Sequence, residues 1–152
     1  MKKIMLIFII GLSLVTFGCN KERSNLKVGN ESNIEIVDSP VTLNLKKNTL
    51  TRTNATFILK NNSLKDIEYG NPYEIEKLIN GKWYKIDASL NFTLPAYELK
   101  SGDEILLELD WKDIYGSLPN GDYRVIKSVS IPNKNEILEN VYISANFSID
   151  SK

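Results

Sequence analysis

The sequence predicts an all-β domain, an antiparallel sandwich of seven or eight strands, and three observations lead to this fold class. Apolar and polar residues alternate from about residue 41 to the C-terminus, which is the period of a strand with one buried face. Asn80-Gly81, the preferred pair of a two-residue hairpin, lies between two such runs. No stretch beyond the first nineteen residues has the pattern of a long amphipathic helix, so packed sheets must supply the core.

The alternating runs locate the strands in order along the chain. Between Trp111 and Gly121 the alternation lapses, and we expect Lys112 to Tyr115 to form a single helical turn that passes from one sheet to the other. The residues expected to face inward from these strands are Val41, Leu43 and Leu45; Ala55, Phe57 and Leu59; Ile105, Leu107, Leu109 and Trp111; Tyr123 and Val125; and Val141, Ile143, Ala145, Phe147 and Ile149.

The Asn80-Gly81 turn joins a run from Tyr73 to Ile79 to a run from Lys82 to Ile86. A two-residue turn fixes the register of the strands that it joins, so Ile79 faces Lys82 and the pairing continues outward from there. Because side chains alternate between the faces of a strand, one set points toward the core. That set is Tyr73, Ile75, Tyr84 and Ile86.

The opposite face of this hairpin carries a candidate binding surface, Trp83 and Leu78. In the expected register, Glu76 and Lys85 form an opposite-charge pair beside them. Aromatic residues dominate binding hot spots, so an exposed Trp83 would serve for contact. The alternative is that Trp83 packs over the sheet edge, and a one-residue bulge would turn it into the core instead. Trp111 is expected to be structural, because it continues the buried face of its strand.

Turn signals between short strands are typical of a sandwich of the immunoglobulin type. Tyr123, two residues after Gly121 and at the start of a strand, occupies the place of the tyrosine corner of such sandwiches, and the alternative is an ordinary core tyrosine. Arg124 follows on the outward face, where we expect it to pair with a carboxylate of a neighbouring strand. With a single cysteine, no disulfide can join the sheets within one molecule, which excludes an antibody-like domain.

The first eighteen residues have the organisation of an export signal. A short basic start precedes an apolar run from Ile4 to Phe17, and Gly18 lies directly before Cys19. The run is shorter than the about 20 residues that span a bilayer as a helix, which disfavours an uncleaved transmembrane anchor. This ending resembles the lipobox of bacterial lipoproteins. The resemblance implies cleavage before Cys19 and a diacylglycerol on its sulfur, which would anchor the protein to the extracytoplasmic face of the cell membrane.

Residues 19–33 are polar and have no apolar period, as is typical of a flexible tether. The chain therefore divides into a signal peptide at 1–18, a lipidated tether at 19–33 and one folded domain at 34–152. Nineteen basic residues balance nineteen acidic residues, so we expect no nucleic-acid partner. The expected partners are the membrane, through the lipid on Cys19, and an unidentified protein or envelope ligand.

An ordered set of short motifs resembles the bacterial immunoglobulin-like domains found in lipoproteins and membrane sensors of Gram-positive bacteria. The motifs are Lys60-Asn61-Asn62-Ser63, Tyr69-Gly70, Tyr73 to Lys77, Asn80-Gly81-Lys82-Trp83-Tyr84, Leu99 with Gly102, Trp111, Tyr115-Gly116, Leu118 and Gly121-Asp122-Tyr123-Arg124-Val125. The resemblance covers about residues 41–149, and Ser101 departs from it, because the family more often has proline before the glycine. It implies a fold and a location, and it transfers no catalytic residues.

The sequence offers little for catalysis. It contains no histidine, which removes the usual general base and the commonest metal ligand, and it lacks calcium-loop and phosphate-loop patterns. Glu108 and Asp110 share the outward face of one strand, and Asp113 follows, so a carboxylate-based hydrolase is a third hypothesis. It is the weakest of the three, because no apolar surroundings would raise the pKa of either strand carboxyl.

We therefore expect no cofactor, no metal and no enzymatic activity. The leading hypothesis is a lipid-anchored extracytoplasmic module that binds a protein, a peptide or an envelope polymer. The alternative is an inhibitor of an extracytoplasmic protease, because a class of bacterial proteinase inhibitors resembles the same sandwich and would need only a projecting loop.

Overall fold

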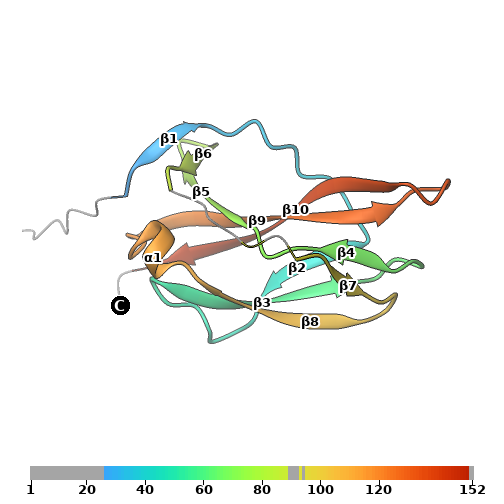
Figure 1. Cartoon of the computed structure of the whole chain (residues 1–152). Helices are drawn as coiled ribbons and strands as arrows, with labels where there is room; N and C mark the ends of the chain where they lie inside the picture. Colours follow the sequence, from blue (N-terminus) through green and yellow to red (C-terminus); the bar gives the residue numbers. More distant parts are fainter. Residues whose placement is uncertain (1–25, 89–92, 94, 151–152) are drawn as a thin grey trace, which may run out of the picture.

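A computed structural model describes residues 26–88, 93 and 95–150, and in this part of the chain two antiparallel sheets pack face to face (Figure 1). The expected all-β, immunoglobulin-like sandwich is confirmed. Sheet A contains β1 (Val28–Glu31), β6 (Lys82–Ile86), β5 (Glu74–Ile79), β9 (Gly121–Pro132), β4 (Ile67–Tyr69) and β7 (Tyr97–Leu99) in that spatial order, with β10 (Leu138–Ile149) also paired to β9. Sheet B contains β2 (Val41–Leu45), β3 (Asn54–Asn61) and β8 (Glu104–Asp110).

The hairpin between β5 and β6 has the expected turn. Asn80 has φ of 51° and Gly81 has φ of 80°, and a type I′ turn requires positive φ at both central residues. The register pairs Ile79 with Lys82 and continues to Glu76 opposite Lys85, as expected. The expected helical turn is also present as α1 (Lys112–Tyr115), and it connects β8 of sheet B to β9 of sheet A.

Three short strands were not expected. β1 lies within the segment expected to be a tether, where Val28 pairs with Ile86 and Glu31 with Tyr84 on β6. An edge strand takes its hydrogen bonds from the backbone of its neighbour, so it can form without an apolar period. Ordered structure therefore begins before residue 34. β4 and β7 contain three residues each, too few to show a period of two.

An aromatic cluster lies at the centre of the core and joins the two sheets. Trp111 is fully buried, and its Nε1 donates to the Arg52 carbonyl at 3.0 Å. The Phe147 ring lies against the rings of Phe57, Trp111 and Tyr123, at centroid distances of 6.2, 5.7 and 5.5 Å. Since β3 supplies Phe57 while β9 and β10 supply Tyr123 and Phe147, this cluster fixes the sheets face to face.

Tyr123 makes the contact of a tyrosine corner, because its hydroxyl donates to the Pro119 carbonyl at 2.8 Å, four residues upstream. Tyr123→Phe keeps the buried ring and removes this hydrogen bond. We expect the free energy of unfolding to fall by about 1–2 kcal/mol in urea titrations, since the partly buried Pro119 carbonyl loses its donor. Tyr142→Phe, at a side chain that is 41% exposed, is the control and should change stability little. Equal effects of the two substitutions would contradict this role for Tyr123.

Lys127 is buried on the core side of β9, 2% exposed, and fixes the connection between β4 and β5. Its ammonium donates to the carbonyls of Gly70 and Pro72 and lies 5.8 Å from the centroid of the Tyr69 ring. Two carbonyl oxygens and a ring face stabilise the ammonium less well than bulk water does. Burial therefore lowers the pKa of Lys127 to about 8.

This lowered pKa predicts that the protein becomes more stable as the pH rises from 7 to 9.5. Over that range the folded chain releases the Lys127 proton while the unfolded chain retains it up to the ordinary lysine pKa of 10.5, so deprotonation favours folding. The expected gain in the free energy of unfolding is about 2 kcal/mol, measured by urea titration at several pH values. Lys127→Met should abolish most of the rise. If the free energy of unfolding of that variant rises with pH as much as in the wild type, other titrating groups cause the rise.

The segment between β1 and β2 crosses the outer face of sheet A, and we call residues 32–37 the strap. The backbone N–H of Ser32 donates to the Trp83 carbonyl on β6 at 2.8 Å, and that of Val37 donates to the Tyr142 carbonyl on β10 at 3.2 Å. β5 and β9 lie between β6 and β10 in the sheet, so the strap passes over both. It runs on the side of β9 and β10 that faces away from β3 and β8 (Figure 1).

The strap covers part of a sheet face that would otherwise be open to solvent. Ile34 and Ile36 are half-buried while Glu35 between them is exposed, so the two isoleucines face the sheet. Glu76 on β5 is 0% exposed and Ile126 on β9 is 2% exposed, although both alternate with core residues and point away from the sandwich interior. The outer face of sheet A is thus a second buried layer beneath the strap.

Candidate functional site

The buried polar residues of this outer face form one cluster. The register places Glu76 of β5 opposite Arg124 of β9. The Nε and Nη2 atoms of Arg124 both donate to Oε2 of Glu76, at 2.8 and 2.7 Å, as expected for a pairing with a neighbouring strand. The guanidinium carbon lies 4.6 Å from the centroid of the Trp83 ring, which adds a cation–π contact. The other carboxylate oxygen of Glu76, Oε1, is buried without a hydrogen-bond partner in the described part of the chain.

The expected ion pair between Glu76 and Lys85 is wrong, although the two residues face each other in the register. Glu76 pairs with Arg124 instead, and the Lys85 ammonium lies 3.8 Å from a carboxylate oxygen of Glu74. The planar guanidinium offers two donors to a buried carboxylate, whereas an ammonium is more strongly hydrated and stays at the surface. Trp83 and Leu78, the residues expected to form a binding surface, are both half-buried on this face.

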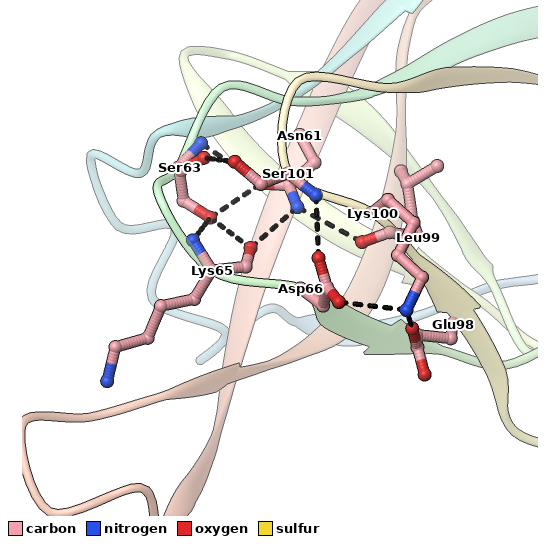
Figure 2. A network of polar contacts seen from close by, with 8 residues as sticks. All are labelled: Asn61, Ser63, Lys65, Asp66, Glu98, Leu99, Lys100 and Ser101. Carbon is pink, nitrogen blue, oxygen red and sulfur yellow. Dashed lines mark hydrogen bonds and ion pairs between the residues drawn. The ribbon is translucent and has the colours of Figure 1, made fainter.

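A second candidate site is the loop end, which we define as residues 62–66, 100–103 and 133–137, the connections from β3 to β4, from β7 to β8 and from β9 to β10. Asn61, fully buried, organises the first of them from within (Figure 2). Its Nδ2 donates to the carbonyls of Lys65 at 2.8 Å and Leu99 at 3.1 Å, and its Oδ1 accepts from the Ser63 backbone at 3.0 Å. One amide side chain thus holds two connections together.

Asp66 and Ser101 join the same two connections at the surface (Figure 2). Asp66 accepts hydrogen bonds from the Lys100 ammonium and from the Ser101 backbone, both at 2.9 Å, and these two donors lower the pKa of its carboxyl. The Ser101 hydroxyl donates to the Ser63 carbonyl at 2.7 Å. A proline, which is more usual at this position in the family that the sequence resembles, has no N–H to give Asp66. The departure at Ser101 therefore adds two hydrogen bonds between the loops.

Lys65 connects the third loop, because its ammonium lies 2.8 Å from the Asn133 carbonyl and 2.6 Å from a carboxylate oxygen of Glu136. Two large apolar side chains project from this network: Leu64 is 98% exposed and Ile137 is 60% exposed. The three connections lie at the right of Figure 1, and β1 begins at the opposite end, near α1. The loop end is therefore the part of the domain farthest from the place where the chain enters it.

The residues considered for catalysis lie apart from these two sites. Glu108, Asp110 and Asp113 are all exposed, and Asp110 accepts from the backbone N–H of Lys112 at 2.9 Å at the start of α1. Within the described ranges, His, Cys, Asp and Glu side chains form no group of three that could hold a metal ion. None of the helices that the structure describes is long and apolar enough to cross a membrane. Cys19 lies outside the described residues.

A family model for the bacterial Ig-like domain matches residues 38–148. The chain belongs to this family. The matched residues run from the segment before β2 to Ser148, near the end of β10, and both Trp83 and the loop end lie within them. β1 and the strap precede the matched residues. A comparison with curated proteins gives no match.

The sequence contains a signal for some of the three unexpected features of these sites, but not for all of them. The alternation of Ile34, Glu35 and Ile36 is a short version of the strand period and could have indicated the strap. The role of Asn61 had a signal in the Asn-Asn-Ser triplet, which predicts a turn but not its buried partners. Leu64, a single apolar residue inside that turn, carried no signal of its extreme exposure.

Proposed function

We propose that this protein is a lipid-anchored, extracytoplasmic Ig-like module without enzymatic activity, which binds a protein, peptide or envelope ligand through its loop end. The observation that carries the proposal is the loop end itself. Three connections are fixed to one another by side-chain hydrogen bonds, and they present Leu64 and Ile137 to solvent. Exposed apolar side chains on a rigid support bind with little further loss of conformational freedom.

The proposed anchor fits this arrangement. Cys19 lies seven residues before Leu26, the first residue of the described part, and the chain enters the domain at the end opposite the loops. Burial of acyl chains is worth about 0.8 kcal/mol per methylene, so two long chains supply on the order of 20 kcal/mol and hold a protein on a membrane without a spanning helix. With the lipid on Cys19, the loop end would face away from the membrane and toward the envelope.

The anchor is tested by expressing the wild type and a Cys19→Ala variant in a bacterial host and comparing the mass and the membrane fractionation of the products. We expect a wild-type N-terminus at a lipid-modified Cys19, and a variant that is neither processed nor retained normally. An unmodified Cys19 with the apolar segment still attached would contradict lipidation and identify an inserted signal anchor instead.

The binding surface is tested separately, with a photo-crosslinking amino acid at single positions of the full chain in living cells. Adducts of defined mass are expected from Leu64 and Ile137. Leu106, which is 51% exposed on the outer face of sheet B, is the matched control and should give none. The same adducts from all three positions would indicate chance collisions, and the absence of adducts at Leu64 and Ile137 would contradict the loop end as the binding surface.

Inhibition of an extracytoplasmic protease is a second candidate, and the 98% exposure of Leu64 on a rigid loop favours it. The full chain would then slow a secreted protease at stoichiometric concentration, and Leu64→Gly would relieve the inhibition. If a broad panel of secreted proteases cleaves its substrates at an unchanged rate in the presence of the full chain, this candidate is removed while the binding proposal stands.

A further inference from the structure

We propose that the outer face of sheet A beneath the strap is a docking site for an extended segment of a partner protein, and that the strap occupies this site within the same chain. We call Glu76, Leu78, Trp83, Arg124 and Ile126 the strap site. The partner segment carries an uncharged side-chain hydrogen-bond donor, such as glutamine or threonine, two residues before an aliphatic residue. This inference goes beyond the function proposed for the loop end, which lies elsewhere on the domain.

The path of the strap shows which of its residues meets which part of the site. The strap leaves β6 at Ser32 and reaches β10 at Val37, so it passes over β5 before β9. Its two inward-facing residues come in the same order, Ile34 and then Ile36. The buried outward-facing residues in their path are Glu76 on β5 and Ile126 on β9. From this order we infer that Ile34 lies over Glu76 and that Ile36 lies over Ile126.

The second contact is well matched, and the first is not. Ile36 and Ile126 are both aliphatic, so their contact buries apolar surface from each side. The side chain of Ile34 has no hydrogen-bond donor, and its backbone N–H donates to Oγ of Ser32 at 3.2 Å. Oε1 of the buried Glu76 carboxylate therefore has no partner among the described residues. A buried acceptor without a donor is strongly unfavourable. A segment with a donor at this position would satisfy Oε1 and would bind the site better than the strap does.

The charge of the site defines the donor. Arg124 already supplies a full positive charge to Glu76 through two hydrogen bonds to Oε2. A second cation would leave an excess charge in this buried layer, which carries a large desolvation penalty. A neutral amide or hydroxyl satisfies Oε1 without that penalty. The carbonyls of Trp83 and Tyr142, which accept hydrogen bonds from the ends of the strap, require backbone N–H groups from an extended segment.

The strap itself is held in a way that permits exchange. None of its residues is fully buried, and its two ends are fixed to the sheet by one backbone hydrogen bond each. The adjoining β1 is a short edge strand whose pairing with β6 is interrupted between Val28 and Glu31. Its flanking ion pairs, Lys27 with Asp87 and Lys82 with Glu31, are exposed and contribute little. Both β1 and the strap lie outside the matched Ig-like domain.

The test uses the full chain with the strap released by Ile34→Glu and Ile36→Glu, because carboxylates in these positions oppose burial beside Glu76. The probes are synthetic peptides that copy residues 28–39: the native copy, a copy with Ile34→Gln and a copy with Ile36→Gln. Binding is followed by the fluorescence of the half-buried Trp83, and a Trp83→Phe variant supplies the background from Trp111. We expect the Ile34→Gln peptide to bind at least tenfold more tightly than the native copy, and the Ile36→Gln peptide to bind less tightly.

Three results would overturn the proposal. One is equal affinity of the native and Ile34→Gln peptides. Another is the absence of binding by a released variant that is still folded. The third is a wild-type chain that forms dimers while the released variant remains monomeric, which would identify the strap of a second copy as the occupant.

A measurement within one chain covers the case in which the released variant does not fold. Ile34→Gln alone should slow hydrogen exchange of the strap amides by about tenfold, and Ile36→Gln should accelerate it. Unslowed exchange in Ile34→Gln would overturn the pairing of Ile34 with Glu76. Leu64→Ser, a loop-end variant, should leave strap exchange unchanged, so a failure here is distinguishable from a failure of the proposed function.

Discussion

Replacing Arg124 by leucine lowers the free energy of unfolding by about 3–5 kcal/mol, the largest loss that we expect from one substitution on the outer face of sheet A. Glu76 is 0% exposed, and Arg124 provides both hydrogen bonds to its Oε2. Without the guanidinium, a carboxylate with no other donor among the described residues remains buried beneath the strap. Urea titrations monitored by circular dichroism measure the loss.

Two further variants separate the buried charge from simple loss of contact. Exchanging both Glu76 and Arg124 for leucine should recover most of the stability, since a buried ion pair can be replaced by apolar side chains at little net loss. Lys85→Leu removes a partly exposed cation of the same face and should change stability by less than about 1 kcal/mol. If Arg124→Leu proves no more damaging than Lys85→Leu, the ion pair does not stabilise the fold in the way described.

The second large effect is expected at the loop end. Asn61→Ala lowers the free energy of unfolding by about 2–4 kcal/mol, because the carbonyls of Lys65 and Leu99 and the Ser63 N–H all lose a buried partner. The loop that Asn61 holds should open more often than the domain as a whole unfolds. Amides of residues 62–66 should exchange with solvent much faster in this variant, while those of β9 and β10 keep their protection.

The neighbouring Asn62 supplies the control, because its side chain is exposed and Asn62→Ala should leave both stability and exchange nearly unchanged. Asn61→Asp retains the acceptor atom but places a carboxylate oxygen against the Lys65 and Leu99 carbonyls in a buried position, so it should be at least as destabilising as Asn61→Ala. Asn61→Ala also tests the proposed function, since Leu64 and Ile137 depend on this network for their positions. If Asn61→Ala exchanges no faster in residues 62–66, Asn61 does not hold the loop.

The strands that bury one complete face could be predicted from the sequence. β2 has the expected bounds, and the turn at Asn80 and Gly81 has the expected register, because both depend on local period and turn chemistry. Trp111 and Tyr123 were placed in the core for the same reason. Each of these inferences requires only that a residue alternates with its neighbours, which the sequence states directly.

What could not be predicted depends on contacts between distant segments. Glu76 has the position of a solvent-facing residue on its strand, and only the strap, contributed by a segment more than thirty residues earlier, removes it from water. Whether Glu76 pairs with Arg124 or with Lys85 depends on which strand lies on the other side of β5. The alternation of apolar and polar residues does not reveal the order of strands in a sheet. The loop end combines three connections whose proximity follows from the same strand order.

The attachment of β1 to β6 also determines how the domain responds to a pulling force. A load applied from the N-terminal side first reaches the hydrogen bond between the Asp87 N–H and the Lys27 carbonyl, and then the Val28 and Glu31 pairs, one after another. Hydrogen bonds that are loaded singly give way at lower tension than bonds loaded together, so β1 and the strap detach while the paired length of β9 and β10 stays intact. Mechanical tension on the N-terminal segment would thus uncover Trp83, Glu76 and Ile126 without unfolding the sandwich.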